Sequence, residues 1–278
     1  MSNEIRAVCY DAELQIEAYR FQGVAHNFPS HFHDYYVIGF IENGQRYMKC
    51  NSKGYVIKSG DIFIFNPRDV HSCEQIEGHA LDYRSINITT SRMKSIVRDI
   101  TGNEFLPTFS PNLLYRSELA QSLKELHDMI FKGETDFIIE ESTYFLIGQL
   151  LQEHSDTLLI GENIIRQTHV PFDTVCDYME KHYARKITLM ELSDLAGLSK
   201  YYFLRSFTRQ RGISPYNYLE TIRIGNAKKL LEKGISPVDA AQQTGFSDQS
   251  HFTNFFKRYI GLTPRQYMRI FPNKERDE

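Results

Sequence analysis

Ala240-Ala241-Gln242-Gln243-Thr244-Gly245-Phe246-Ser247 closely parallels an earlier stretch of the chain, Leu192-Ser193-Asp194-Leu195-Ala196-Gly197-Leu198-Ser199. Gly197 and Gly245 align at an offset of 48, and after one inserted residue the offset becomes 49 and stays there. The matched pairs that follow are Ser199 with Asp248, Phe203 with Phe252, Phe207 with Phe256, Gly212 with Gly261, Pro215 with Pro264 and Tyr218 with Tyr267. A solenoid needs at least about three repeats to bury a core, so two copies indicate a duplicated small module instead.

Each copy is predicted to form a helix, a tight turn and a second helix. Glycine tolerates the left-handed conformation that such a turn needs, so Gly197 and Gly245 mark the ends of the first helices. Ser199 and Asp248 are suited to N-cap the second helices. Buried phenylalanines, a closing glycine and a capped proline then follow in each copy, at Phe203, Phe207, Gly212 and Ser214-Pro215 and at Phe252, Phe256, Gly261 and Thr263-Pro264. This is the layout of the helix-turn-helix, whose second helix enters the major groove of DNA.

The face of each second helix opposite the phenylalanines carries side chains suited to DNA. Arg can bind guanine with two hydrogen bonds, Asn or Gln can bind adenine, and Ser or Thr can bind either base. Base contacts are expected from Tyr201, Tyr202, Arg205, Gln249, Ser250, His251 and Asn254. Phosphate contacts are expected from Lys200, Thr208, Arg209, Lys257 and Arg258. A merely solvated helix face could have this composition, but two copies with matching caps favour DNA recognition.

The segment 215–233 joins the two copies and reads as one helix. Its apolar positions are Tyr218, Leu219, Ile222, Ala227, Leu230 and Leu231. Its 19 residues would span about 28 Å, whereas successive major-groove faces lie ~34 Å apart. We expect one chain to place both recognition helices in adjacent major grooves on one side of the duplex, with some bending of the DNA or tilting of the modules.

The distribution of charge also favours DNA binding by the back half of the chain. The whole chain has a net charge of −3, which is unusual for a DNA-binding protein. Residues 1–171 contain 15 Lys and Arg against 23 Asp and Glu, whereas residues 172–278 contain 17 against 12. The front half is therefore acidic and the back half basic, which indicates that only the back half meets a polyanion. Ordinary scatter of surface charge between domains is the alternative explanation.

Composition places the chain among globular proteins with two domains. It has 278 residues, of which 41% are hydrophobic and 24% charged. No apolar run approaches the ~20 residues that span a membrane, and the first residues lack a signal-peptide pattern, so we expect a cytoplasmic protein. The four cysteines are scattered, which favours free thiols over disulfides or zinc ligands; they are Cys9, Cys50, Cys73 and Cys176.

The front half of the chain changes from strand to helix patterns. Residues 5–90 read as short strands, such as 35–41 and 62–65, separated by turn signals, which predicts an all-β barrel or sandwich. From about 117 the apolar residues recur every three or four positions, at Leu119, Leu123, Leu126 and Ile130, which predicts a helix ending at Gly133. A second helix should run to about His154. The predicted domains are a β-barrel (1–115), a helical dimerisation segment (116–155), a linker (156–171) and a DNA-binding helical domain (172–278).

From these residues the chain resembles the AraC/XylS family of bacterial transcription regulators. The second copy, Gly245 through Phe252 and on to Tyr267, is similar to the family signature almost throughout, with departures at His251 and Asn254. The front half resembles the cupin-like sensor barrel of a family member: His31-Phe32-His33 to Gly44 is similar to the first cupin motif, and Gly60-Asp61 to His71 to the second. The resemblance implies a regulator that responds to a small molecule bound in the barrel. RNA polymerase is an expected partner if the protein is an activator.

The resemblance also suggests what the barrel binds. Polar candidates around an apolar effector pocket are His31, His33, Arg46, Tyr47, His71 and Arg84. Metal cupins bind a metal with three histidines and a glutamate; His31, His33 and His71 match, but Tyr36-Val37 stands near the place of the glutamate. Three histidines and a water could still bind a divalent metal. They could instead shape a metal-free pocket, and no other cofactor is implied.

Several alternatives remain open from sequence alone. The apolar stripes of residues 116–155 could form a homodimer interface or pack on their own barrel. The function best supported is a ligand-responsive transcription regulator and not an enzyme. A metal-dependent cupin oxygenase or isomerase with a DNA-binding tail is one alternative, and an architectural protein without a sensor is another.

Overall fold

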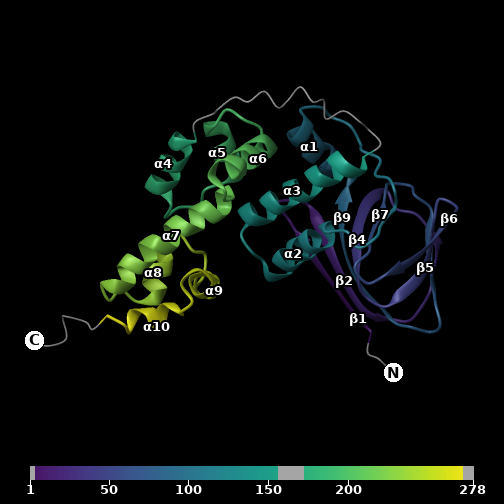
Figure 1. The fold of residues 1–278 in the computed structure, drawn as a ribbon, viewed down its shortest axis with the longest axis horizontal. Helices are drawn as coiled ribbons and strands as arrows, with labels where there is room; N and C mark the ends of the chain where they lie inside the picture. Colours follow the sequence, from purple (N-terminus) through teal and green to yellow (C-terminus); the bar gives the residue numbers. More distant parts are fainter. Residues whose placement is uncertain (1–3, 156–171, 272–278) are drawn as a thin grey trace, which may run out of the picture. The chain divides into compact units, whose positions relative to one another are not determined.

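The computed structural model describes residues 4–155 and 172–271 and consists of two compact units, Met1–Gln167 and Thr168–Glu278 (Figure 1). In their described parts, the N-terminal unit is a β structure with three helices, and the C-terminal unit is entirely helical. The predicted linker, 156–171, lies outside the described residues. Among the helices that are described, none is both long and apolar enough to cross a membrane.

Two antiparallel sheets form the N-terminal unit, as the strand pattern predicts. A six-stranded sheet has the order β1-β2-β9-β4-β7-β10, and a four-stranded sheet has the order β3-β8-β5-β6. The strands are β1 (Ile5–Asp11), β2 (Ile16–Val24), β3 (Phe28–His31), β4 (Tyr35–Asn43), β5 (Gln45–Cys50), β6 (Lys53–Lys58), β7 (Ile62–Phe65), β8 (His71–Gln75), β9 (Leu81–Thr89) and β10 (Leu113–Leu114). The expected cupin-like barrel is therefore confirmed as a fold built from two facing sheets.

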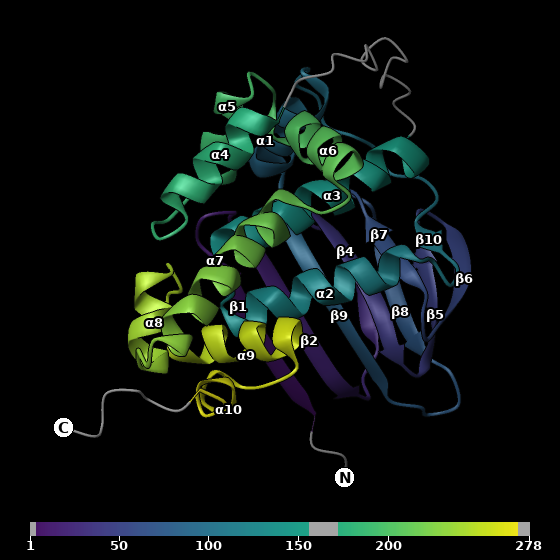
Figure 2. The same ribbon diagram turned by 60° about the vertical axis from the view of Figure 1, so that its left-hand side comes forward.

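The described residues of the N-terminal unit also form three helices: α1 (Thr90–Thr101), α2 (Leu119–Lys132) and α3 (Asp136–His154). Figure 2 shows α2 lying across the larger sheet, where it contacts β1, β2, β4 and β9, and α3 packs on α1 and α2. Side chains alternate across a strand, so Ile38, Ile86 and Ile88 are fully buried on the helix side. The neighbouring residues on these strands face the other sheet.

Helices α2 and α3 match the prediction, and Gly133 ends α2 with φ 62°. The apolar stripe of α2, from Leu119 to Ile130, is buried within the monomer. That burial favours the alternative in which this stripe packs on its own barrel. Helix α1 and the two-residue strand β10 were not predicted.

The C-terminal unit contains α4 (Asp173–His182), α5 (Leu189–Leu195), α6 (Lys200–Arg211), α7 (Pro215–Glu232), α8 (Pro237–Gln243), α9 (Gln249–Ile260) and α10 (Pro264–Met268). The predicted repeat is confirmed: α5 and α6 form one helix-turn-helix, and α8 and α9 form the other. The hydroxyl of Ser199 accepts from Tyr202 N at 3.4 Å, and the carboxylate of Asp248 accepts from His251 N at 2.7 Å. The predicted phenylalanines, Phe203, Phe207, Phe252 and Phe256, are fully buried.

Helix α7 joins the two helix-turn-helix units, as predicted, and begins at the predicted Ser214 cap and Pro215. It is one continuous helix of 18 residues, about 27 Å long at the usual rise per residue. Its buried Arg223 donates to the carbonyls of Tyr183 and Arg185 and to the carboxylate of Glu220. These bonds attach the end of α4 to the connecting helix.

Candidate nucleic-acid interface and ligand pocket

The second helix of each module presents exposed polar side chains to solvent. On α6 Arg205 and Arg209 are exposed, Tyr202 is half-buried, and Lys200 at the first turn is also half-buried. On α9 the exposed side chains are Gln249, Ser250, Asn254, Lys257 and Arg258. Arg205 and Asn254 occupy equivalent positions in the two copies, because the offset between the helices is 49. Each module therefore offers one side chain able to form paired hydrogen bonds with a base at the same point of its helix.

Three residues predicted to contact DNA are engaged inside the domain. Tyr201 is only 8% exposed, because it lies on the same side of α6 as the buried Leu204. The hydroxyl oxygen of Thr208 is also buried. Tyr201 and Thr208 are thus less accessible to DNA than the other residues predicted on α6. His251 is half-buried, with its ring 4.7 Å from that of Phe255 and its Nε2 3.5 Å from the Tyr216 hydroxyl.

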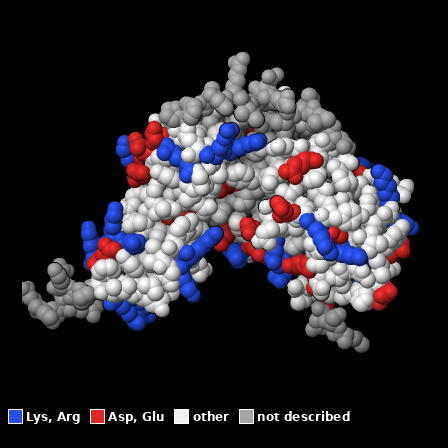
Figure 3. Space-filling view, viewed as in Figure 1, with Lys and Arg blue, Asp and Glu red and all other residues white. Residues whose placement is uncertain are grey.

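Basic side chains are common on the surface of the C-terminal unit. Figure 3 shows Lys and Arg gathered over these helices, at the left of the view. Both second helices carry basic side chains in their last turns. These are Arg209 and Arg211 on α6 and Lys257 and Arg258 on α9. Arg211 pairs with Asp173 at 2.6 Å, so it is partly neutralised. The other three basic side chains can contact DNA phosphates, and such contacts supply affinity without sequence selectivity.

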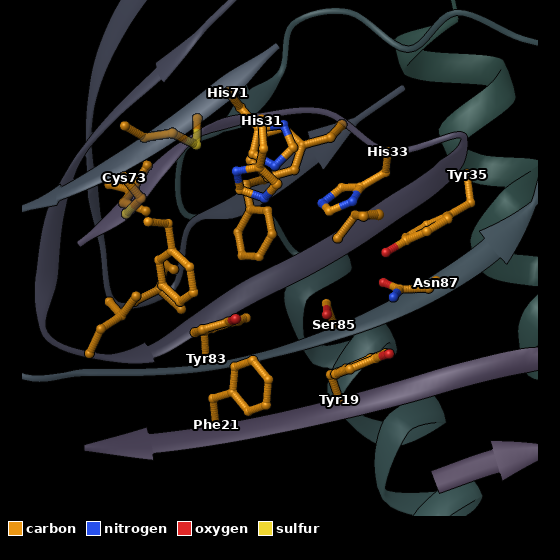
Figure 4. A pocket seen from close by; sticks show the side chains of 18 residues that line it. Tyr19, Phe21, His31, His33, Tyr35, His71, Cys73, Tyr83, Ser85 and Asn87 are labelled. Carbon is orange, nitrogen blue, oxygen red and sulfur yellow. The ribbon is translucent and has the colours of Figure 1, made fainter. Parts of the chain in front are cut away.

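A cavity of about 230 Å³ lies between the two sheets of the N-terminal unit (Figure 4). Its walls are mainly apolar and aromatic, and none of its 18 described lining residues is Lys, Arg, Asp or Glu. The polar part is formed by His31, His33, Tyr35 and His71, with Tyr19, Tyr83, Ser85 and Asn87 across the cavity. A small apolar molecule with a few hydrogen-bonding groups fits such a site.

The three histidines that sequence predicted for the pocket are brought together. Ring centroids lie 4.9 Å apart for His31 and His33, 4.4 Å for His31 and His71, and 5.0 Å for His33 and His71. Each can offer a ring nitrogen, and these nitrogens all lie within 4.8 Å of one another. His31 is the last residue of β3, His71 is the first residue of β8, and His33 lies in the connection between β3 and β4.

Burial disfavours the charged forms of several ionisable groups in the cavity. Desolvation lowers the pKa of His71 to about 4, and desolvation followed by the nearby His31 lowers the pKa of His33. Burial also raises the pKa of the Cys73 thiol to about 11 and that of the Tyr19 hydroxyl to about 12. The imidazoles of His33 and His71 therefore have lone pairs to share, and the Tyr19 hydroxyl remains a hydrogen-bond donor.

Arg46, Tyr47 and Arg84, which the sequence also suggested for the effector pocket, do not line this cavity. The cavity is lined on β5 by Met48 and on β9 by Leu81, Tyr83, Ser85 and Asn87. Strand alternation turns the adjacent Tyr47 and Arg84 to the opposite face. Arg46 is fully buried but outside the cavity lining. Its guanidinium donates to the carbonyls of Val24 at 2.5 Å and His79 at 2.6 Å.

Most of the pocket residues were missed by sequence reasoning. They are Tyr19, Phe21, Phe28, Tyr35, Val37, Ile41, Met48, Ile57, Phe63, Phe65, Cys73, Leu81, Tyr83, Ser85 and Asn87. Many occupy alternate positions of β2, β4, β7 and β9. Side chains alternate between the two faces of a strand, but the sequence alone did not establish which alternate set of residues faces the second sheet.

Two contacts connect the walls of the cavity to α2. His127 of α2 is fully buried, and its Nε2 lies 2.9 Å from the carbonyl oxygen of Tyr19. Arg84 of β9 pairs with Glu42 at 2.7 Å and also with Asp128 of α2. Strands that contribute to the cavity are thus attached to the helix that covers the opposite face of their sheet.

Comparisons with known proteins agree with both parts. Residues 13–146 match the model of the AraC-like ligand binding domain, and residues 192–270 match a helix-turn-helix domain. The chain is 53% identical to the Bacillus subtilis protein named uncharacterized HTH-type transcriptional regulator YbfI, over 90% of each chain. It is 26% identical to the HTH-type transcriptional activator RhaS of Pectobacterium carotovorum, over 86% of each chain.

A crystal structure of the DNA-binding domain of AdpA in complex with a target DNA is 27% identical, covers 36% of this chain and 91% of that one, and superimposes with a TM-score of 0.35. The matches to YbfI and to the two domain models favour a regulator over a metal-dependent enzyme. With its ligand-binding barrel and paired helix-turn-helix units, the chain belongs to the AraC family of transcription regulators.

Proposed function

We propose that the barrel cavity binds a small-molecule effector and that binding changes how the two helix-turn-helix units bind promoter DNA. The observation that carries this proposal is the mainly apolar cavity between the two sheets, whose walls also anchor α2. An effector can shift the protein between two states only if it binds them unequally. The contacts of His127 and Arg84 with α2 are the part of the barrel through which occupancy can favour one state.

The DNA-binding residues form the second part of the proposal. We assign base contacts to Arg205 and Asn254, supported by Tyr202, Gln249 and Ser250, all of which have exposed or half-exposed side chains. Phosphate contacts are assigned to Lys200, Arg209, Lys257 and Arg258. His251 is assigned a positioning role, because its ring packs against Phe246 and Phe255 inside the second module.

Selection from random duplex DNA at near-physiological salt tests this assignment. We expect enrichment of two sequence boxes about one helical turn apart. Arg205→Ala should then weaken binding to the selected sequence by about 1–3 kcal/mol and relax the preference at one position. Asn254→Ala should do the same at a position in the other box. Retention of DNA without any enriched sequence, with and without cell extract as a source of effector, would contradict sequence-specific recognition.

Arg209→Ala provides a charge-matched comparison on the same helix. Loss of a phosphate contact should weaken binding to selected and unrelated DNA alike. It should also reduce the slope of log affinity against log salt concentration by about one. Fluorescence anisotropy at several salt concentrations separates the two variants. An equal loss of selectivity in Arg205→Ala and Arg209→Ala would refute the division into base and phosphate contacts.

Assembly and location complete the proposal. We propose a cytoplasmic homodimer, because promoter DNA lies there and two linked chains would present four reading helices with increased avidity. The buried stripe of α2 leaves the interface to other residues. Light scattering on the purified protein should give twice the mass of the 32.5 kDa chain. If the protein activates transcription, RNA polymerase is its further partner, which a reconstituted transcription assay would detect.

A further inference from the structure

Two of the clustered histidines are held in one tautomer by the backbone. The Nδ1 of His31 lies 2.7 Å from the carbonyl oxygen of Pro29, and the Nδ1 of His71 lies 2.9 Å from that of Asp69. A carbonyl oxygen only accepts, so each Nδ1 carries the ring proton. In its neutral form each of these two rings therefore keeps an unprotonated Nε2. Carbonyl hydrogen bonds of this kind orient histidines that bind metals.

The position of the cluster agrees with a metal site. Ligand nitrogens around a zinc ion, at about 2.0–2.1 Å from it, lie within about 4 Å of one another. The ring nitrogens of His31, His33 and His71 all lie within 4.8 Å, so small side-chain rotations suffice. All three residues line the cavity, and Phe65 stacks on the His71 ring at 3.7 Å and restricts it.

The remainder of the cavity explains why an ion would be useful there. Val37 lines the cavity and stands near the sequence position where metal cupins have a glutamate ligand. Its side chain is apolar and cannot bind a metal. Since none of the described lining residues is Lys or Arg, the described residues supply no cation for an anionic ligand. A metal bound to three neutral imidazoles would keep coordination positions for such a ligand.

We infer that His31, His33 and His71 bind one divalent transition-metal ion, and that this ion anchors the effector through an oxygen donor. This inference rests on the proposed function of the cavity as the effector site. The effector class is a small molecule with an apolar or aromatic body and one anionic oxygen group that coordinates metals. The body would contact the aromatic wall, and the size is limited by a cavity of about 230 Å³. For comparison, a cavity of about 150 Å³ in another protein holds benzene.

Metal binding by the full-length protein tests the first part. The chelator-treated protein is titrated with Co²⁺ and Zn²⁺, and bound metal is measured by elemental analysis and by the visible spectrum of Co²⁺. We expect about one equivalent per chain. His33→Gln and His71→Gln should each weaken metal binding at least about 100-fold. This loss exceeds the one expected when the changed group only hydrogen-bonds to a metal ligand. His33 is half-buried, so its variant remains informative if the variant of buried His71 fails to fold.

His79→Gln is the matched control, because its side chain is 58% exposed and outside the cavity. It should bind metal as the unchanged protein does. Less than about a tenth of an equivalent in the unchanged protein would overturn the inference. Unweakened binding in both cavity variants would also overturn it, since the ion would then be held elsewhere.

A pair of probes tests the second part. Benzohydroxamate has an aromatic body and a metal-coordinating oxygen group, whereas benzamide has the same body without the hydroxyl. Benzohydroxamate should change the Co²⁺ spectrum saturably, and benzamide should leave it unchanged. No change with benzohydroxamate would overturn the role of the ion as an anchor. If the protein binds the metal but enriches no sequence in the selection from random DNA, the proposed function is contradicted and the metal site is not. The two failures can therefore be told apart.

Discussion

Arg223 and Glu220 form a buried ion pair on α7, with an Nη1–Oε1 distance of 2.9 Å and Glu220 fully buried. The same guanidinium donates to the carbonyls of Tyr183 and Arg185. Removing one partner of a buried pair leaves a desolvated charge, which is strongly unfavourable. Arg223 therefore links the N-terminal helix of the DNA-binding unit to the connecting helix.

Arg223→Met should destabilise the DNA-binding unit by about 3–5 kcal/mol. Urea unfolding followed by circular dichroism at 222 nm measures the change. Glu220→Leu combined with Arg223→Met should recover part of the loss, because the buried carboxylate is also removed. Lys229→Ala, at an exposed position of the same helix, should change stability by less than about 0.5 kcal/mol. A small effect of Arg223→Met would show that its hydrogen bonds are replaced by water.

His127 should make the stability of the barrel depend on pH. Burial lowers the pKa of His127 to about 4, whereas an unfolded histidine has a pKa of about 6.5. Below pH 6.5 the unfolded chain binds a proton that the folded chain does not, so stability is lost as pH falls from 6.5 towards 4 and is constant above 6.5. The contribution lost by pH 5 is about 2 kcal/mol.

Substitution by Gln retains a side-chain donor for the Tyr19 carbonyl but does not titrate. The free energy of unfolding of His127→Gln should therefore fall by about 2 kcal/mol less than that of the unchanged protein between pH 7 and pH 5. Chemical unfolding at both pH values measures this difference. Parallel pH profiles for the two proteins would mean that His127 is solvated in solution.

The phase of side chains along the strands limited what sequence could predict about the pocket. His31, His33 and His71 were identified correctly as neighbours because they carry a recognisable motif. Arg46 and Arg84 were chosen for their charge. An arginine at a buried strand position is satisfied equally well by carbonyls or by carboxylates on the far face, and composition does not distinguish those surroundings from a ligand site.

At the scale of elements, the turns of the two helix-turn-helix units differ although their glycines correspond. Gly197 has φ 65° and Gly245 has φ 84°, so both backbones are left-handed. Among the described residues, nothing lies within 4 Å of a Cβ placed on Gly197. A Cβ on Gly245 would lie 2.7 Å from the carbonyl oxygen of Tyr183 and 3.0 Å from the carbonyl of Ala184.

Gly197→Ala should cost about 1–2 kcal/mol, which is the ordinary penalty of the left-handed conformation for an L-residue. Gly245→Ala carries the same penalty and a steric clash with backbone, so it should cost distinctly more. Urea midpoints of the two variants, measured side by side, give the comparison. Equal midpoints would show that the end of α4 moves away from the second turn without loss of stability.

Elements with strong local signals were predicted from sequence, and weaker ones were not. The helices of the repeat carry caps, glycine stops and spaced phenylalanines that all agree, and each was found. Helix α1 was missed, although Thr89 caps it, Gly102 ends it, and Met93, Ile96, Val97 and Ile100 recur at helical spacing. It follows β9 directly at Thr89, so no turn signal separated the helix from the strand pattern before it.

At the scale of the DNA-binding unit, α7 sets the separation of the two recognition helices. A single helix of 18 residues does not stretch as a flexible linker does. Inserting five base pairs between the two selected boxes would rotate one box by about half a turn of DNA. Affinity should then fall close to that for one box alone, as gel-shift titration can measure. Unchanged affinity would mean that the modules bind independently.

The unequal surroundings of the two turn glycines bear on how this regulator could be redesigned. A Cβ at Gly197 would meet no described atom, whereas the turn at Gly245 is packed against the end of α4. Mutant libraries for new operator sequences would thus yield more folded members when diversity is concentrated in the first module. The second module would serve as an unvaried anchor, and the evolved proteins would differ in the half of the operator next to α6.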